Sequence, residues 1–466
     1  MTRQMGFPAL WCKWIEGILV SARSSVLVNG SPTFEINCSK GVRQGDLLSP
    51  FLILLVMEGL SNILYKARIE ALLRGIPIIS HLFYADDALL LGEWEEDNVK
   101  NVARCLRIFY LASGLKINLQ KSNIYGLGVG NDEVLNMCNV IGCKSDSIPL
   151  TYLGISVGSN MNRINNWTPI IEVFDKRLSA WKAKTLSIGG RLTLINSVLE
   201  SLPIYYFSLY KAPVGVIKTL EAKMRKFLWV GSSNINKMNW VAWDWVTWPK
   251  NIGGLGINRL LEVNEALLVK WGWRFRVENH NLWRKVVEAC HGKANHWSFL
   301  PLNSNIAGCW KNVVKLLNKL KLNGRGLNRL ILGKVGNGVE TRFWIDSWLG
   351  DLPFMERWPL LFGLELFKSC RVAERFETVQ ENRVYDWQWS RQPKFEEELK
   401  EWKECLEALS NVSLSSDKDK WYWFDDNQKV VSVKAVKKSL IVERVTSHPP
   451  NFNWCKWVPI KCNIMA

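Results

Sequence analysis

Residues 81–91, HLFYADDALLL, place two aspartates side by side between two apolar runs. The apolar residues before and after them predict two short strands joined by a tight turn. Neighbouring carboxylates repel each other, and each is costly to bury without compensation. The chain must therefore fold so that the tip of this hairpin meets solvent or positive charge.

The charge distribution points to a polyanionic partner. The 466 residues suffice for two or three domains, and their formal net charge is +17. Residues 176–250 hold 12 Lys and Arg against 3 Asp and Glu, whereas residues 374–426 hold 14 acidic against 8 basic residues. Such basic balance favours nucleic acid or an anionic membrane surface. The middle of the chain is thus the expected polyanion-facing part.

Cysteine usage and hydropathy predict a soluble intracellular protein, in the nucleus or the cytoplasm. The 11 cysteines form no C-x-x-C pair, which indicates reduced thiols and no disulfide scaffold. Glu16 interrupts the early apolar stretch, so no secretory leader is expected. The longest clean apolar run, residues 51–57, is too short to cross a bilayer. No membrane partner is predicted.

Strand and helix patterns alternate in the first third of the chain. Asn29-Gly30, between residues 26–28 and 34–38, is a strong hairpin signal. Ser49-Pro50 opens a helix, with the serine as cap and the proline at the first helical position. The further predicted elements are a helix over 97–113 that stops at Gly114, a half-buried strand over 115–121 and a strand over 151–157. In this order the elements predict an antiparallel sheet backed by helices.

The hydrophobic period changes near Ser159, where we place a domain boundary. Beyond it, apolar residues recur at helical spacing and basic residues occupy other faces. The stripes are Ile171, Phe174, Leu178 and Trp181; Leu192, Ile195 and Leu199; and Ile217, Leu220, Met224 and Phe227. Of the 25 tryptophans, 21 follow residue 180. They could stack on bases, but core packing is the favoured interpretation.

The paired aspartates of the hairpin suit a divalent metal ion. In two-metal phosphoryl transfer, carboxylates hold two Mg²⁺ ions roughly 3.5–4 Å apart. At a strand turn the side chains of Asp86 and Asp87 diverge, so that one can face a ligand while the other braces the site. An isolated Asp-Asp pair more often marks a polar turn. The neighbouring segments therefore decide between the two interpretations.

Four segments in a fixed order resemble motifs of reverse transcriptases. Residues 83–87, FYADD, resemble the Y-x-D-D box, and residues 41–50, GVRQGDLLSP, resemble the R-Q-G-D-P-L-S-P box, with Leu47 where proline is usual. Residues 113–122 and 152–154 resemble the next two motifs. Residues 181–199, and a stretch that opens with Gly336-Asn337-Gly338, are similar to regions of non-LTR (LINE-type) retrotransposons, especially plant ones. The resemblance covers nearly the whole chain.

The resemblance implies an α+β fold and an order of domains. A partial polymerase palm, an antiparallel sheet backed by helices, would be followed by a basic helical thumb and a Trp-rich, mostly helical C-terminal region. The implied ranges are 1–158 for the palm, 159–280 for the thumb, 281–420 for a Trp-rich connector and 421–466 for the truncated start of a zinc-binding domain. The ligands of that domain would follow Ala466. Cys455, Cys462 and His448 lack ligand spacing, so no zinc site is predicted and packing roles are expected for them.

The resemblance also implies roles in a two-Mg²⁺ polymerase site. Asp86 would be the principal metal ligand and Asp87 its supporting carboxylate. Gln44 and Gly45 would let the backbone approach the template and the incoming nucleotide, and Arg43 would meet phosphate.

The remaining implied roles concern the primer and the leaving group. Lys121 would stand near the leaving pyrophosphate as proton donor or charge partner, unless it is an ordinary solvated lysine. Tyr84 and Ala85 would line the floor beneath the primer end, with core packing as the competing role of Tyr84.

Basic helices after the palm would contact the template–primer backbone through phosphate charge, with steep salt sensitivity. The residues are Lys176, Arg177, Lys182, Lys184, Lys218, Lys223, Arg225 and Lys226. The implied partners are an RNA template, a DNA primer and deoxynucleoside triphosphates, and the oligomeric state is left open.

One part of the family pattern is missing from the sequence. Family members carry an earlier F-x-x-D strand with the first catalytic aspartate, whereas the first aspartate here is Asp46, inside the glutamine-glycine box. We expect a reverse transcriptase by lineage that is inactive alone, because one hairpin under-ligates two metal ions. The alternatives are a non-catalytic nucleic-acid-binding remnant and a decayed reading frame with no cellular role.

Overall fold

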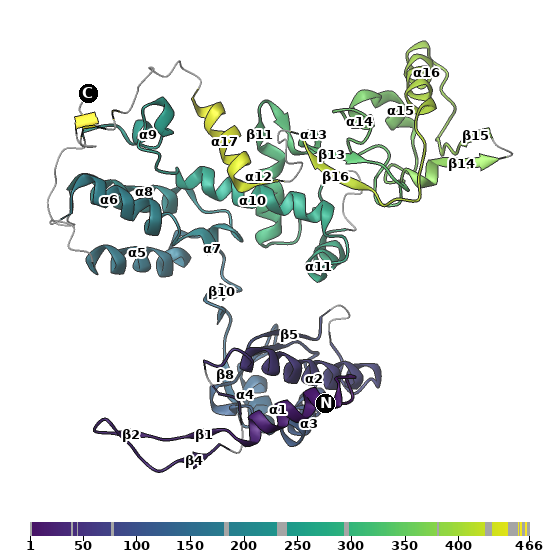
Figure 1. Ribbon diagram of the computed structural model, residues 1–466. Coiled ribbons are helices and arrows are strands. Elements are labelled where there is room, and N and C mark those ends of the chain that lie inside the picture. The colour runs from purple at the N-terminus through teal and green to yellow at the C-terminus, as the bar shows by residue number, and fades with distance from the viewer. Residues whose placement is uncertain are drawn as a thin grey trace. The chain divides into compact units, whose positions relative to one another are not determined.

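The chain forms two compact units, Met1–Gly158 and Ser159–Ala466 (Figure 1). The division falls where the hydrophobic period changes in the sequence. The computed structural model describes residues 2–38, 41–43, 45–75, 79–180, 186–230, 240–292, 298–379, 382–424, 431–445, 455, 457–458 and 462–463. Both units combine helices with small sheets, so the chain is α+β, as the sequence predicts.

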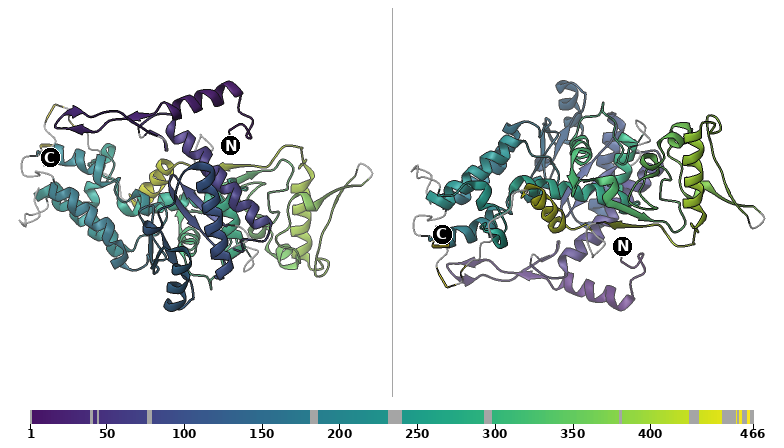
Figure 2. Two further views of the ribbon diagram at one scale, coloured as in Figure 1. Left: turned by 90° about the horizontal axis from the view of Figure 1, so that it is seen from below. Right: turned by 90° about the horizontal axis from the view of Figure 1, so that it is seen from above.

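A two-stranded ribbon follows the first helix, α1 (Ala9–Val20). It pairs β1 (Arg23–Ser24) with β4 (Ile36–Asn37) and β2 (Leu27–Val28) with β3 (Ser31–Pro32). Asn29 and Gly30 have φ of 50° and 81°, the positive values that a type I′ hairpin turn requires. The predicted hairpin is confirmed, and the ribbon extends away from its own unit (Figures 1 and 2).

The core of the first unit lies between α2 (Ser49–Ile69) and α3 (Glu96–Ser113). Leu60 and Leu64 of α2 are buried with Cys105 and Phe109 of α3. Gly114 ends α3 with φ of 72°, as predicted. Among the described residues, α2 is the one helix with the length and composition to cross a membrane, a criterion that core helices of soluble proteins also meet.

The strands of the first unit form separate two-stranded sheets, and the predicted single antiparallel sheet is not seen among the described residues. The pairs are β5 (His81–Tyr84) with β6 (Asp87–Leu90), β7 (Asn123–Tyr125) with β8 (Lys144–Asp146), and β9 (Leu150–Tyr152) with β10 (Ile155–Val157). The β7–β8 pair is parallel and flanks α4 (Asn131–Ile141). The β5–β6 pair packs on the α2–α3 core through Phe83 and Leu90, and the β7–β8 pair contacts α4.

Two strand predictions are wrong for local reasons. Residues 119–121 form a 3-10 turn, because the Asn118 side chain accepts hydrogen bonds from the backbone N–H groups of Gln120 (3.1 Å) and Lys121 (3.2 Å). The stretch 151–157 is part of a hairpin, because Leu153 and Gly154 take φ of 50° and 74° and reverse the chain.

The first core of the second unit consists of the predicted amphipathic helices. They are α5 (Thr168–Ala180), α6 (Ile188–Leu194) continued by a π-helical turn over Ile195–Leu199, and α8 (Val214–Val230), packed on the start of α10 (Leu260–Val277). Phe174, Ile195 and Leu220 are fully buried there. The helical stripes are confirmed for the described residues, and Trp181 lies outside them.

Two further cores complete the second unit. One joins α10 and α12 (Cys309–Lys319) to the pair β13 (Ile331–Lys334) and β16 (Lys420–Trp423) and to α17 (Val433–Arg444). The other surrounds Phe343 and Trp344 beside α16 (Glu396–Ser410). The core around α10 takes residues from both sides of the predicted boundaries at 280 and 420. Residues of the implied thumb, connector and zinc-domain segments therefore pack together in one core.

The remaining elements are short or lie at the edges of these cores. They are α7 (Ile204–Phe207), α9 (Trp243–Val246), α11 (Leu282–His291), β11 (Lys321–Leu322), β12 (Arg325–Gly326), α13 (Leu327–Leu330), α14 (Phe354–Arg357), α15 (Pro359–Leu364), β14 (Phe376–Val379) and β15 (Asn382–Tyr385).

Most described tryptophans of the second unit pack in these cores. Trp167, Trp344 and Trp358 are fully buried, which agrees with core packing as the main use of this residue. Trp240, Trp245 and Trp457 are exceptions, because all three are exposed. Buried aromatic surface therefore contributes to the stability of this unit together with the aliphatic core residues.

Replacing Phe174 with alanine tests the first core of the second unit. The fully buried ring leaves a cavity, and we expect a loss of about 3–5 kcal/mol in the free energy of unfolding of this unit, measured with urea. The neighbouring Val173→Ala is the control, because Val173 is 44% exposed. Equal losses in the two variants would contradict the packing described here.

Candidate active site

The aspartate hairpin is built with one apolar face and one polar face. In the register of β5 and β6, Phe83 pairs with Ala88 and Tyr84 with Asp87, so Tyr84 and Asp87 share the face opposite Phe83. Phe83 packs on the core of α2 and α3. Asp86 and Asp87 are exposed, and so is Tyr84 at 63%, which leaves no core-packing role for this tyrosine.

The hairpin turn holds a strained residue. Ala85 has φ of 53°, a left-handed conformation that costs an L-residue about 1–2 kcal/mol. The turn has only Ala85 and Asp86 between the strands, and the positive φ at its first position fits a two-residue hairpin loop. Asp86 lies in this turn and Asp87 begins the next strand, and both are exposed to solvent.

His81 ties the base of the hairpin to α2. Its Nε2 lies 2.9 Å from the Ser61 hydroxyl of α2, and its Nδ1 lies 2.9 Å from the Ser80 hydroxyl. Burial, with a contribution from Arg68, lowers the pKa of His81 below its usual value. A neutral ring can donate to one hydroxyl and accept from the other, so this contact fixes the orientation of β5 at neutral pH.

The glutamine-glycine box forms a closed loop at the start of α2. The Ser49 hydroxyl lies 2.7 Å from the Arg43 carbonyl oxygen and 3.1 Å from the Asp46 carboxylate, which also accepts from the Ser49 N–H at 3.2 Å. Asp46 therefore does the capping that was predicted for Ser49, which is already inside the helix. Gly45 has φ of 86° and Arg43 is exposed, whereas Gln44 lies outside the described residues.

The last two motifs contribute Lys121 and Tyr152 to the neighbourhood of the hairpin. Lys121 is exposed at the end of the 3-10 turn that replaces the predicted strand. Tyr152 of β9 is near enough to the hairpin for its pKa to be raised, mainly by burial and also by the negative charge of Asp87. Its proximity to Asp87 could not be read from the motif alone.

One cavity of about 1620 Å³ within the first unit brings the four motif segments together. It exceeds the range of roughly 300–1,000 Å³ that small-molecule pockets usually have. Its walls include residues from each segment, among them Gly41, Asp86, Asp87, Lys121 and Tyr152. Segments more than 100 residues apart in the chain thus reach one site, with carboxylates and a lysine available to it.

Among the described residues, no group of three or more carboxylate, imidazole or thiol side chains is placed to hold a metal ion. The two aspartates alone offer donors for one hard cation, since Mg²⁺ commonly binds one or two carboxylates and completes its shell with water and phosphate. A second ion would need donors beyond the described ones. Within the described part of the chain, the two aspartates are therefore the candidates for holding a divalent ion.

The first unit matches a known family over nearly its whole length. The family model for reverse transcriptase (RNA-dependent DNA polymerase) matches residues 2–157. The chain is 33% identical over 198 residues to a putative ribonuclease H protein of Arabidopsis thaliana, which is 42% of this chain and 31% of that protein.

Two similar proteins come from mobile elements. A 149 kDa protein of transposon TX1 of Xenopus laevis is 29% identical over 251 residues, 52% of this chain and 18% of that protein. The Pol polyprotein of the type-2 retrotransposable element R2DM of Drosophila melanogaster is 24% identical over 292 residues, 58% of this chain and 26% of that protein. The chain belongs to the reverse transcriptases of non-LTR retrotransposons. It spans about a third or less of the length of these three relatives.

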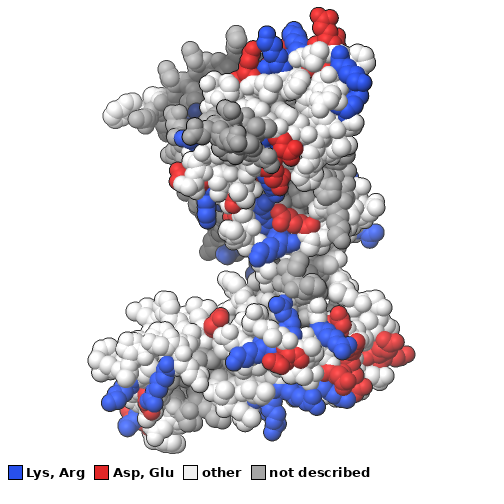
Figure 3. All heavy atoms as spheres, turned by 90° about the vertical axis from the view of Figure 1, so that its right-hand side faces the viewer, with Lys and Arg blue, Asp and Glu red and all other residues white. Residues whose placement is uncertain are grey.

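The basic residues expected to meet nucleic acid divide into two groups in this reverse transcriptase. Lys176, Arg177, Lys218 and Lys226 are exposed on α5 and α8. Lys223 binds Asp175 of α5 at 2.5 Å, and Arg225 lies over the ring of Trp243. Lys182 and Lys184 lie outside the described residues. Figure 3 shows another face of the chain, on which basic and acidic side chains are interspersed.

The C-terminal cysteines differ from their prediction. Cys455 and Cys462 are exposed, so the packing roles expected for them are wrong, and His448 lies outside the described residues. Their surroundings are polar, because the side chain of Asn463 bonds to the backbone N–H and C=O of Cys455.

Replacing Asp46 with alanine should loosen the glutamine-glycine box. The variant loses the acceptor for the Ser49 N–H, and we expect a loss of about 1 kcal/mol in the free energy of unfolding of the first unit, measured with urea. The control is Leu47→Ala in the same loop, because Leu47 is 89% exposed. A variant as stable as this control would argue against the capping role of Asp46.

Proposed function

We propose that the chain carries part of an RNA-directed DNA polymerase of a non-LTR retrotransposon and acts inside the cell, in the nucleus or the cytoplasm. The substrates would be an RNA template, a DNA primer and deoxynucleoside triphosphates. The observation that carries this proposal is the cavity shared by the four motif segments, with Asp86, Asp87 and Lys121 in its walls. The family of the chain supports the same reaction class.

Each residue of the site has a task that follows from its chemistry. Asp86 and Asp87, at the strained tip, would bind Mg²⁺, and the bound ion would polarise the phosphate of the nucleotide. Arg43 is exposed in the glutamine-glycine box and would bind phosphate oxygens. Gly45 presents backbone without a side chain to the template and nucleotide, in a conformation with positive φ.

Two further residues would act on the leaving group and the primer. Lys121 would neutralise the leaving pyrophosphate or give it a proton, since its ammonium group is exposed to the cavity. Tyr84 is exposed on the same face of the hairpin as Asp87, next to Ala85 in the turn, and would support the primer end.

The polymerase would be inactive as this chain alone. In-line displacement assisted by two metal ions needs ligands for both, and the described residues supply a donor set for one. The exposed Lys and Arg of α5 and α8 would nevertheless bind the nucleic-acid backbone, because phosphate contacts require exposed cations and not an assembled metal centre.

Primer extension tests the activity and its expected absence. With Mg²⁺, an RNA template and a DNA primer, we expect no nucleotide addition by the purified chain. Clear extension of the primer would refute the expectation that the chain alone is inactive.

Mn²⁺ binding tests the hairpin as the metal site. The affinity for Mn²⁺, followed by paramagnetic resonance, should weaken at least about tenfold, about 1.4 kcal/mol, in Asp86→Asn/Asp87→Asn. Glu70→Gln, which removes an exposed charge of the same unit, is the control. Equal affinities in both variants would show that the hairpin is not the metal site.

Salt dependence tests the nucleic-acid surface. Each phosphate that a cation meets contributes a slope of about −0.9 to the logarithm of the binding constant against that of the salt concentration for duplex DNA. Replacing Lys176, Arg177, Lys218 and Lys226 with glutamine should reduce the slope for a template–primer duplex by roughly one for each of these cations that meets a phosphate. Lys223→Gln is the control, because this lysine is paired with Asp175. If the variant with all four substitutions has the same salt slope as the unmodified chain, the nucleic-acid-binding surface lies elsewhere.

A further inference from the structure

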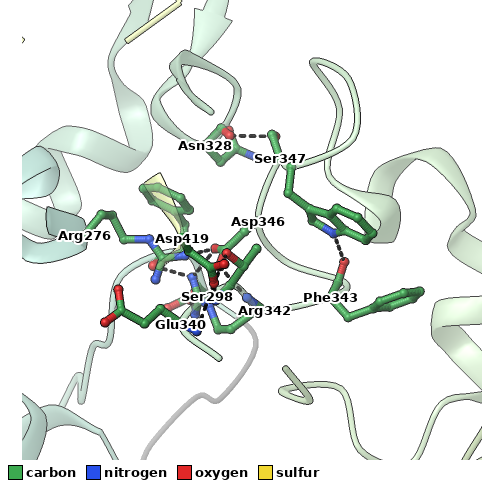
Figure 4. Close-up of polar contacts among 12 residues, drawn as sticks. Arg276, Ser298, Asn328, Glu340, Arg342, Phe343, Asp346, Ser347 and Asp419 are labelled. Atoms are coloured by element: carbon green, nitrogen blue, oxygen red, sulfur yellow. Dashed lines mark hydrogen bonds and ion pairs between the residues drawn. The ribbon is translucent and has the colours of Figure 1, made fainter. Parts of the chain in front are cut away.

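The motif that opens with Gly336-Asn337-Gly338 has no part in the polymerase site, and it forms a loop around a buried carboxylate. The carboxylate belongs to Asp419, which lies far along the chain and is 8% exposed. Figure 4 shows Asp419 among the polar contacts at this place, close to Glu340 and Arg342. The loop runs from Gly336 to Thr341 and follows directly on β13 and Val335.

Both oxygens of the Asp419 carboxylate are saturated by this loop. Oδ1 accepts from the backbone N–H groups of Gly336 at 2.7 Å and Gly338 at 2.9 Å. Oδ2 accepts from the N–H groups of Glu340 and Thr341, each at 3.0 Å, and from the Thr341 hydroxyl at 2.8 Å. Successive backbone N–H groups that converge in this way form an anion-binding concavity. Hydrogen bonds to an ionised acceptor are also stronger than neutral ones.

The loop is held in this orientation from outside. Its carbonyl oxygens point away from Asp419 and are satisfied by the neighbouring chain. The donors are the backbone N–H groups of Ser415, Ala373 and Val372, which bond to Gly336, Gly338 and Thr341, and the Arg371 guanidinium, which bonds to Glu340. The inward N–H groups are therefore fixed donors, and without an anion they would be buried and unpaired.

The two glycines of the motif are required by this geometry. Gly338 has φ of 71°, and a Cβ atom there would lie 2.7 Å from the Ala373 nitrogen. A Cβ atom at Gly336 would collide with the Asp417 carbonyl oxygen, because the strand that delivers Asp419 passes so closely. The motif thus specifies both the shape of the loop and the approach of its ligand.

The contact joins two cores of the second unit. Thr341 leads directly to Phe343 and Trp344 in one core, and Asp419 leads directly to β16, whose Trp423 lies in another. Beyond β16 the chain continues to α17, where Arg444 binds Glu262 of α10 at 2.6 Å. Burial acts to raise the pKa of Asp419, but the hydrogen bonds from the loop hold it below its usual value.

We propose that residues 336–341 form an anion-binding nest whose ligand is the Asp419 carboxylate, and that this contact locks β16 and α17 onto the second unit. The donors divide between the two oxygens of one carboxylate, two on Oδ1 and three on Oδ2. A small free carboxylate should therefore replace the side chain when it is removed.

Hydrogen exchange of the full-length chain tests the lock. Asp419→Asn keeps the shape but turns one acceptor into a donor that faces N–H groups. We expect amide exchange in residues 420–423 and 433–444 to rise at least about tenfold, about 1.4 kcal/mol, while the first core around Phe174 is unchanged. Asp417→Asn is the matched control, because Asp417 is exposed and carries the same charge. Equal exchange in both variants would overturn the proposal.

Two further readouts identify the anion. In Asp419→Gly, sodium formate should restore slow exchange in residues 420–423, whereas sodium chloride at the same ionic strength should not. If this variant does not fold, Thr341→Val, which removes one donor, should raise exchange in the same residues about threefold, about 0.7 kcal/mol. A folded glycine variant that formate leaves unprotected, or a valine variant with unchanged exchange, would refute the nest.

The pH dependence has a defined sign. The Asp419 pKa is lowered in the folded state, so its contribution is present at neutral pH and is lost as the pH falls through the folded-state value. The difference in exchange between the unmodified chain and Asp419→Asn should therefore shrink under acid conditions. A difference that stays constant as the pH is lowered through this range would also contradict the lock.

Discussion

A carboxylate can be buried only where other groups replace the hydrogen bonds that it made with water. This constraint explains where both units place their key carboxylates. In the second unit Asp346 is fully buried against the guanidinium groups of Arg276 and Arg342. Burial acts to raise the Asp346 pKa, but the two arginines hold it low. Asp419 meets the same requirement with the backbone N–H groups and one hydroxyl of its loop. In each case the carboxylate is held by groups that the surrounding chain already fixes, so the cost of desolvation is offset.

The first unit leaves the two carboxylates of its hairpin in solvent and does not bury them among donors. Its hairpin buries Phe83 on one face and leaves Asp86 and Asp87 exposed at the tip, where a ligand rather than the protein must supply positive charge. The positive φ of Ala85 is the local cost of this arrangement. Asp86 and Asp87 therefore differ from Asp346 and Asp419, because they lie exposed in the wall of a cavity and not among donors of the protein.

The sequence predicts structure well where neighbouring residues decide it. Asn29-Gly30 sets its own turn, Gly114 ends its helix, and the stripe around Phe174 fixes a buried face. The prediction fails where a side chain competes with the backbone pattern. Asn118 bonds to its own following N–H groups and converts an alternating stretch into a 3-10 turn. Long-range pairings were also beyond the reach of periodicity, because nothing in the local pattern of Lys420–Trp423 indicates that it pairs with Ile331–Lys334.

The same limit applies to the candidate site. The motifs pointed to Asp86, Asp87 and Lys121, but the place of Tyr152 beside Asp87 and the capping by Asp46 depend on how the chain returns to itself.

The docking of α17 on α10 has a consequence for the order in which the chain can fold. Arg444 supplies the cation for Glu262, and Leu440 and Trp423 fill the core that α10 begins. During synthesis this core cannot close until α17 has emerged from the ribosome, whereas the core between α2 and α3 can close once α3 has emerged. The first core of the second unit takes its buried residues from Met161 to Val263 and can close before α17 is made, whereas the apolar faces of α10 and α12 stay open until α17 arrives.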